Sequence, residues 1–265
     1  MKTSALKIAL KALGLTTVSS IADEVVLKAE KENWSYNDFL LFLCENELNE
    51  RKNKKIERYL KLSKLPDGKT LSTLNEAFLP SEVRKQIPCL LHGKFIEKAV
   101  NVLAFGLPGR GKTHFLCAIA HELIMKYQYK ILFTPTYKII QALQNAKEKL
   151  ELENALKKFD SFDIIIIDDI GYVQHTREEM EVFFTFLADR YERKSLMISS
   201  NLTFSKWENI FKNPMTAMAA VDRLVHHSII IEFDNDSIRA KQACQKDRKA
   251  EKNITKNIEK GGAEM

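Results

Sequence analysis

The chain has few of the residues that would indicate a secreted or a metal-stapled protein. Of its 265 residues only 4 are cysteine, 6 are proline and 9 are glycine. The cysteines lie far apart, at positions 44, 89, 117 and 244, with no CxxC pair and no histidine at ligand spacing. We therefore expect neither a disulfide framework nor a zinc site, and we expect a cytoplasmic location.

The sequence also lacks a long apolar run. The most apolar stretch is centred on the four isoleucines at 164–167, whereas a helix needs roughly 20 apolar residues to cross a bilayer. Lys7 and Lys11 interrupt the apolar N-terminal stretch, and no small-residue cleavage site follows it. This pattern favours a short amphipathic helix over a signal peptide, and we expect no membrane segment.

What is present is a globular composition with a basic balance. Hydrophobic residues make up 45% of the chain, which is enough for a sizeable core and argues against wholesale disorder. The 41 Lys and Arg exceed the 35 Asp and Glu, which gives a net charge of +6. Such a charge permits nucleic-acid binding but does not indicate it, because many enzymes are equally basic.

The pattern along the chain predicts four segments. Residues 1–65 are expected to form a helical domain that binds DNA or a partner, and residues 66–100 a linker with short helices, since the sequence PDG at 66–68 breaks the helical pattern. Residues 101–235 are expected to form the main domain. Residues 236–265 are rich in lysine and offer little core, so they are expected to form a basic, flexible tail.

Within 101–235, short apolar runs alternate with helical patterns. Strands are predicted at 101–106, 130–135, 162–168, 195–201 and 228–233, and helices at 112–127, 137–159 and 176–194, with two short helices after 201. Near-continuous apolar strands that alternate with helices indicate a parallel sheet covered by helices on both faces. The predicted fold class is therefore α/β, preceded by a small all-helical domain.

The stretch GLPGRGKTH at 106–114 has the features of a phosphate-binding loop. It matches G-x-x-x-x-G-K-[ST], with an apolar strand before it and a helix after it. Backbone N–H groups and the helix dipole favour phosphate, Lys112 can reach the β- and γ-phosphates of ATP, and the Thr113 hydroxyl can bind Mg²⁺. The expected ATP-binding residues are Gly106, Pro108, Gly109, Arg110, Gly111, Lys112, Thr113 and His114.

Two polar strand ends complete the predicted site. In IIIIDDIGY, at 164–172, Asp168 is placed to support Mg²⁺ and Asp169 to act as general base on a water molecule. Asn201 ends the strand LMISSN and can orient the water if this strand lies beside the phosphate-loop strand. The alternatives are a solvated acidic strand end for the two aspartates and an N-cap of a helix near Phe204 for Asn201.

A cluster of cations in the N-terminal domain is the predicted DNA contact. Its cations far outnumber the one acid in the same stretch, Glu57. This imbalance favours binding to a polyanion such as the phosphate backbone of DNA over an ordinary solvated helix face with mixed charges. Tyr59 can stack on a base or lie in the core. The cations of the cluster are Arg51, Lys52, Lys54, Lys55, Arg58, Lys61 and Lys64.

These motifs together resemble the IstB-like ATPases, AAA+ helpers of insertion-sequence transposition that are similar to DnaC-type helicase loaders. The likeness runs from about Leu10 to Arg239. It is carried by GLPGRGKTHF, IIIIDDIGY, RYERKSLMISSNLTFSKWENIF and AAVDRLVHH, and in the N-terminal part by LKALGL, SYNDFLLFLCENEL and ERKNKKIERYLKLSKLP.

The resemblance implies an ATPase that uses ATP and Mg²⁺, assembles into a homo-oligomer on duplex DNA, and stimulates a transposase. It places Asn201 at the sensor-1 position and Arg223 at the arginine-finger position, from which Arg223 enters a neighbour's site. From position alone, a surface salt bridge with Asp222 or Glu192 would be favoured for Arg223. Arg190 and Arg193 fall in a region that faces a neighbour or DNA, and the only sensor-2 candidate is Arg239.

Three other functions are compatible with the motifs. A helicase loader would prefer single-stranded DNA and bind a replicative helicase. A small-molecule kinase would carry a lid insertion after the fourth strand, which the sequence lacks. A nucleotide-gated scaffold would bind ATP and hydrolyse it slowly, consistent with Asp169 standing where many AAA+ proteins have the longer Glu.

Overall fold

The computed structural model describes residues 2–171, 176–202 and 224–238 of the chain. Its contacts divide the chain into two compact units, residues 1–59 and residues 60–265. Helix α3 (Tyr36–Ser63) begins in the first unit and ends in the second. Each unit is described by itself below.

The smaller unit consists of α1 (Lys2–Ala12), α2 (Thr16–Lys31) and most of α3. Its core is small, with Val18, Val25 and Leu43 buried and Trp34 packed beside them. Ser35 caps α3, because its Oγ accepts a hydrogen bond from the Asp38 backbone N–H at 3.2 Å. The helical character predicted for this segment is confirmed.

A buried carboxylate joins α3 to the start of α2. Glu47 Oε2 accepts hydrogen bonds from the backbone N–H groups of Thr17 at 2.9 Å and Val18 at 3.1 Å. On its other side, Glu47 Oε1 accepts from Arg51 Nε at 2.8 Å, and Arg51 Nη2 donates to the Gly14 carbonyl at 2.7 Å. Glu47 therefore caps α2 from 30 residues away, which local pattern does not reveal.

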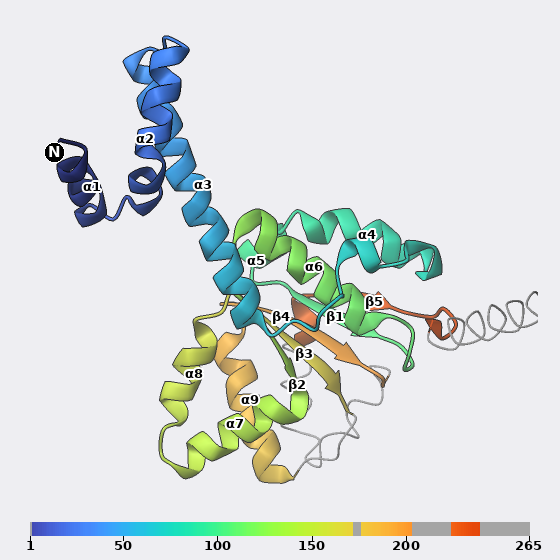
Figure 1. Ribbon diagram of the computed structural model, residues 1–265. Helices are drawn as coiled ribbons and strands as arrows, with labels where there is room; N and C mark the ends of the chain where they lie inside the picture. The colour runs from blue at the N-terminus through green and yellow to red at the C-terminus, as the bar shows by residue number, and fades with distance from the viewer. Residues whose placement is uncertain (1, 172–175, 203–223, 239–265) are drawn as a thin grey trace, which may run out of the picture. The chain divides into compact units, whose positions relative to one another are not determined.

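The larger unit contains a five-stranded, fully parallel sheet in the order β2-β3-β4-β1-β5 (Figure 1). The predicted strands are confirmed with small changes at their ends. Their bounds are β1 Asn101–Phe105, β2 Ile131–Pro135, β3 Ile164–Ile170, β4 Ser195–Ser200 and β5 Ser228–Glu232. Because β4 pairs with β1, the strand that ends at Asn201 does lie beside the phosphate-loop strand.

Helices cover both faces of the sheet, as predicted. Figure 1 shows α4, α5 and α6 on one face and α7, α8 and α9 on the other. The bounds are α4 Ser81–Leu91, α5 Lys94–Glu97, α6 Lys112–Tyr127, α7 Thr136–Glu148, α8 Leu152–Asp160 and α9 Arg177–Arg190. Two short 3₁₀ turns, Leu71–Thr73 and Glu76–Phe78, precede α4.

Two helical predictions need correction. The stretch 137–159 is not continuous, because Leu150 adopts a left-handed φ of 58° and separates α7 from α8. The helix predicted over 176–194 ends at Arg190, and the residues that follow turn into β4. The two short helices predicted after residue 201 fall within 203–223, outside the described residues.

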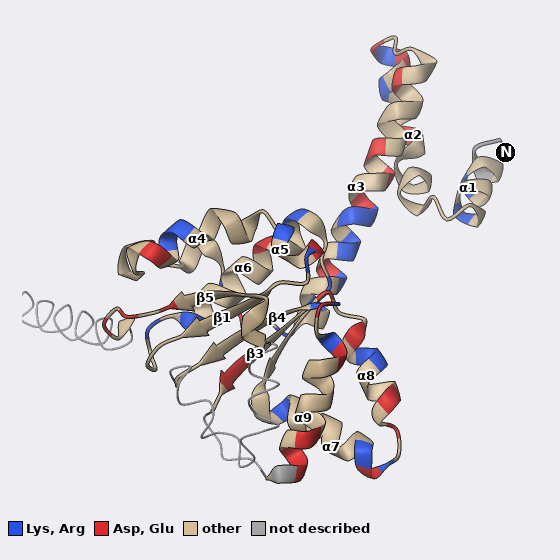
Figure 2. Cartoon of the chain, turned by 180° about the vertical axis from the view of Figure 1, so that it is seen from behind, with Lys and Arg blue, Asp and Glu red and all other residues tan. Residues whose placement is uncertain are grey.

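The described helices include none that is long and apolar enough to cross a membrane. The described cysteines Cys44, Cys89 and Cys117 are free thiols. Figure 2 shows that Lys and Arg gather along the C-terminal half of α3, where the cationic cluster of residues 51–64 lies.

Candidate nucleotide-binding site

The loop between β1 and α6 has the backbone of a phosphate cradle. Gly106 has φ of 149° and Gly111 has φ of 99°, values that side chains rarely permit. A Cβ at Gly106 would lie 2.5 Å from the carbonyl oxygen of Phe233, and one at Gly111 would lie 3.0 Å from Ile238 Cδ1. The glycines of the motif are therefore required both by backbone conformation and by the close approach of residues 233–238.

Lys112 lies inside this loop and is 4% exposed. Its Nζ donates hydrogen bonds to the Gly106 carbonyl at 2.6 Å, the Leu107 carbonyl at 3.0 Å and Asn201 Oδ1 at 2.7 Å. The ammonium is thus held at the loop by the end of β4. A cation fixed in this position is suited to binding the terminal phosphates of a nucleotide.

The two predicted metal-supporting residues are in contact. Thr113 Oγ1 donates to Asp168 Oδ1 at 2.8 Å, although 55 residues separate them. Ser199 Oγ donates to the same carboxylate oxygen at 2.6 Å, and the Asp169 backbone N–H donates to Ser199 Oγ at 2.9 Å. The hydroxyl and the carboxylate are thus held side by side, and both offer oxygen atoms. Mg²⁺ prefers oxygen ligands of this kind. Ser199 was not predicted, since an isolated serine in a buried strand gives no signal.

Asp169 and Asn201 are also brought together. Asn201 Nδ2 donates to Asp169 Oδ1 at 3.0 Å, while Asn201 Oδ1 accepts from Lys112. The Asp169 backbone has φ of 59°, in the left-handed region, and the β3–β4 register is irregular between Ile167 and Ile170. This irregularity places Asp168 and Asp169 in different environments, and strained backbone of this kind is concentrated at functional sites.

The side chains of Arg110 and His114 have partners in the protein. Arg110 Nη1 donates to the Phe233 carbonyl at 2.8 Å, which ties the phosphate loop to the segment after β5. Ile238 N–H adds a hydrogen bond to the Gly109 carbonyl at 2.9 Å. His114 Nε2 lies 3.0 Å from Thr73 Oγ1, and burial lowers the pKa of this histidine. Both side chains therefore stabilise the loop's surroundings, and nucleotide contacts from these residues stay a prediction.

A pocket of about 240 Å³ opens beside the loop. Its lining includes Lys112, Thr113, Asp169 and Asn201, so these predicted residues share one cavity. No sequence motif indicated a second wall of this pocket. That wall includes Lys69, Thr73, Leu74, Asn75 and Ile238.

Four predictions concern residues that the structure does not describe, in whole or in part. Arg223, the arginine-finger candidate, and Arg239, the sensor-2 candidate, lie outside the described residues, as does most of the tail 236–265. The alternative role of Asn201 as an N-cap near Phe204 also falls there. Glu192, an alternative partner for Arg223, lies 2.9 Å from His227 in an ion-pair contact.

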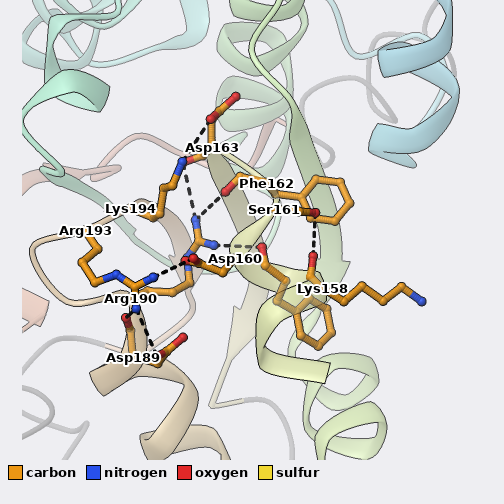
Figure 3. A network of polar contacts seen from close by, with 10 residues as sticks. Lys158, Asp160, Ser161, Phe162, Asp163, Asp189, Arg190, Arg193 and Lys194 are labelled. Carbon is orange, nitrogen blue, oxygen red and sulfur yellow. Dashed lines mark hydrogen bonds and ion pairs between the residues drawn. The ribbon is translucent and has the colours of Figure 1, made fainter. Parts of the chain in front are cut away.

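The prediction that Arg190 faces a neighbour or DNA is wrong, because the residue is only 1% exposed. Figure 3 shows its guanidinium pointing into the protein, between the end of α8, the start of β3 and the start of β4. Its Nη atoms donate at 3.0 to 3.4 Å to the backbone carbonyls of Phe159, Phe162, Asp163 and Ser195.

Arg193 is on the surface, but its guanidinium is engaged. It forms ion pairs with Asp160 at 2.6 Å and Asp189 at 3.1 Å (Figure 3). Lys194 lies 3.2 Å from Asp163 in the same network. This network closes the loops at the amino ends of β3 and β4, at the opposite strand ends from Asp168 and Asn201.

The cationic cluster of residues 51–64 is partly occupied by contacts within the protein. Arg51 is bound to Glu47 and Gly14, and Lys54 lies 3.3 Å from Glu50. The charges of Lys55 and Arg58 lie 5.5 and 5.4 Å from the ring centre of Tyr59. Tyr59 is half-buried under these cations. Arg51 therefore stabilises the fold of the smaller unit. DNA binding by the other cations of the cluster stays a prediction.

Comparison with known proteins gives a consistent family. The family model described as IstB-like ATP binding protein matches residues 8–246. An insertion-sequence ATP-binding protein of Sinorhizobium fredii is 38% identical over 244 residues, covering 92% of this chain and 82% of that protein. One of Pseudomonas aeruginosa is 33% identical over 237 residues, covering 89% of each chain. One of Geobacillus stearothermophilus is 35% identical over 214 residues, covering 81% of this chain and 85% of that protein.

Solved structures agree on the fold. A DnaC helicase loader matches with a TM-score of 0.54 at 18% identity, covering 67% of this chain and 99% of that chain. AMPPCP-bound DnaA from Aquifex aeolicus matches with a TM-score of 0.52 at 20% identity, covering 65% of this chain and 52% of that chain. At such identity the likeness concerns the fold alone, and it confirms the predicted α/β class as a P-loop AAA+ fold.

Proposed function

Since the chain belongs to the family of IstB-like ATP-binding proteins, we propose that it is an ATPase that assists DNA transposition. In this proposal it acts in the cytoplasm, assembles as a homo-oligomer on duplex DNA and stimulates a transposase. The insertion-sequence context of its relatives supports a transposase as the partner.

The observation that carries the proposal is the hydrogen-bonded series Lys112–Asn201–Asp169 at the phosphate loop. Lys112 is suited to bind the β- and γ-phosphates. Asn201 holds both the Lys112 ammonium and the Asp169 carboxylate in place. A water molecule that donates a hydrogen bond to Asp169 would therefore lie near the terminal phosphate. Such an arrangement is suited to hydrolysis, not only to binding.

Thr113 and Asp168 are the residues that would hold Mg²⁺, and the bound ion would offset charge on the phosphates during hydrolysis. Ser199 orients the Asp168 carboxylate through its hydrogen bond. Asp169 is shorter than glutamate, so we expect slow hydrolysis. In the oligomer, Arg223 of a neighbour is proposed to complete the site, as the family resemblance implies.

The test of this function is DNA binding by the purified protein, with and without ATP and Mg²⁺, at one fixed salt concentration. Duplex and single-stranded oligonucleotides of equal length are compared by fluorescence anisotropy. We expect cooperative, ATP-dependent binding to duplex, and loss of the ATP dependence in Lys112→Ala. A preference for single strands would favour a helicase loader instead. Binding of ATP but of neither DNA would favour a scaffold or kinase and overturn the proposal.

The cationic cluster gives a sharper prediction. The triple change Lys54→Ala, Lys55→Ala and Arg58→Ala should weaken duplex binding and reduce the slope of log affinity against log salt by about 2 to 3, since each phosphate contact contributes about 0.9. Nucleotide affinity should stay unchanged, because these residues are absent from the described pocket lining.

The matched control for that variant removes three exposed lysines from another surface, Lys149, Lys157 and Lys158. It loses the same formal charge, so a general electrostatic effect would appear equally in both variants. Equal duplex affinity and equal salt slope in the two variants would show that the cluster is an ordinary solvated helix face.

A further inference from the structure

The second wall of the nucleotide pocket carries a lysine that the phosphate-loop motif does not include. Lys69 precedes the 3₁₀ turn Leu71–Thr73 and lines the same cavity as Lys112 and Asn201. It is half-buried. Lys69 has no hydrogen-bond or ion-pair partner among the residues that the structure describes.

The backbone on both sides of Lys69 is fixed. Thr73 Oγ1 donates to the Gly68 carbonyl at 2.6 Å and accepts from the Thr70 N–H at 3.0 Å, so the residues before and after Lys69 are bound to one hydroxyl. Leu74, next in the chain, is buried. The lysine is therefore presented by a rigid turn and not by a loose linker.

This 3₁₀ turn packs against α6, directly after the phosphate loop. His114 Nε2 lies 3.0 Å from Thr73 Oγ1 and 3.3 Å from the Thr70 carbonyl oxygen. Since a carbonyl can only accept, Nε2 carries a hydrogen and donates to Thr70. The contact with His114, which follows Thr113, attaches the turn that carries Lys69 to the first turn of α6.

The electrostatics agree with this position. Burial raises the pKa of the Cys117 thiol to about 12, and the Lys69 charge acts in the opposite direction. The Lys69 charge therefore acts on α6, the helix whose N-terminus forms the phosphate cradle.

The described lining of the pocket contains two lysines, Lys69 and Lys112, and no arginine. The Arg110 side chain lies outside this lining and is bound to the Phe233 carbonyl. We propose that Lys69 is a second phosphate-binding cation of this site and contacts the phosphate chain of the nucleotide from the second wall of the pocket. This inference rests on the proposed ATP-binding function and adds a residue to it.

The test replaces Lys69 with methionine, which keeps length and apolar contact but removes the charge, and with arginine, which keeps the charge. Lys98→Met, an exposed lysine of the same unit, is the matched control. Binding of ATP, ADP and adenosine is measured by competition with a fluorescent ATP analogue. Lys69→Met should weaken ATP and ADP binding about tenfold or more, as loss of a charge-assisted hydrogen bond does. Adenosine binding should stay unchanged, and Lys69→Arg should stay within about threefold of the parent.

A second measurement needs no variant. The parent protein is treated with an amine-reactive reagent, with and without saturating ATP, and modification is followed residue by residue by mass spectrometry. We expect ATP to slow the modification of Lys69 several-fold and to leave that of Lys98 unchanged.

The outcomes separate the inference from the function on which it rests. If Lys69→Met binds ATP as tightly as the parent while Lys112→Ala does not, the inference is overturned and the ATPase proposal stands. Unchanged labelling of Lys69 in the presence of ATP would overturn it as well. If the parent does not bind ATP at all, the proposed function itself fails.

Discussion

Arg190 is a charged residue whose role is structural. Its guanidinium donates to four backbone carbonyls and is almost completely buried. Burial lowers its pKa to about 10, and the nearby charges of Asp160, Asp163 and Asp189 oppose that shift. The residue therefore remains charged at neutral pH, and it satisfies carbonyls where α8 enters β3 and where β4 begins. Buried carbonyls without a donor would each destabilise the fold.

We predict that Arg190→Met lowers the free energy of unfolding by about 3 kcal/mol, since several buried carbonyls lose a charged donor. Urea denaturation followed by circular dichroism measures this change. Arg193→Met is the matched control, because its ion pairs are half-exposed and are worth about 1 kcal/mol or less. Equal stability of the two variants would contradict the structural role assigned to Arg190.

At the scale of elements, the phosphate loop is held by the segment that follows β5. Phe233 accepts from Arg110 and lies against Gly106, while the Ile238 N–H donates to Gly109. The ring of Phe233 also packs edge-on against Phe115 of α6, with centroids 5.5 Å apart. The conformation of the loop therefore depends on residues more than 120 positions later in the chain.

Gly106→Ala is predicted to disturb this contact. The new Cβ would meet the Phe233 carbonyl oxygen at 2.5 Å in a backbone of φ 149°, so we expect a loss of about 2 to 4 kcal/mol in stability. Gly68→Ala is the control, because its φ is 72° but nothing lies within 4 Å of its Cβ position. It should cost only about 1 to 2 kcal/mol of backbone strain. Thermal unfolding of both variants tests the difference, and an equal loss would exclude a steric clash at Gly106.

At the scale of the whole molecule, the chain is built as two units with separate means of stabilisation. The larger unit has an extended apolar core around the sheet. The smaller unit buries few apolar side chains and relies in addition on Glu47, which joins α2 and α3. The hydrogen bond from Arg51 holds the pKa of Glu47 below its usual value of 4.5, burial opposes this, and the N–H groups of Val18 and Thr17 add to the lowering.

This arrangement predicts a pH dependence of the smaller unit. Because the folded-state pKa of Glu47 is lowered, its stabilising effect is complete above the unfolded value and is lost as pH falls below about 4.5 through the folded pKa. Glu47→Gln should be less stable than the parent at pH 7, and the difference should shrink in acid. Trp34 fluorescence reports this unit once the only other tryptophan, Trp207, is replaced by phenylalanine. A difference that stays constant between pH 7 and pH 3 would contradict the prediction.

Much of the ATPase unit could be predicted because its signals are local. The phosphate-loop motif, the apolar strand followed by Asp168 and Asp169, and the strand that ends at Asn201 are each contained in fewer than ten residues. Strand and helix patterns depend on neighbouring residues, so the parallel sheet covered on both faces followed from them.

Only the tertiary structure decided which of these residues contact one another and which have a structural role instead. The sheet order places β4 between β3 and β1, and so Asn201 reaches both Asp169 and Lys112. Lys69 reaches the pocket through a turn docked on His114. Arg190 looked like a surface cation and proved to be buried, since burial depends on contacts between residues far apart in the chain. The sequence by itself determined the chemistry available to this protein, whereas long-range packing determined where that chemistry is brought together.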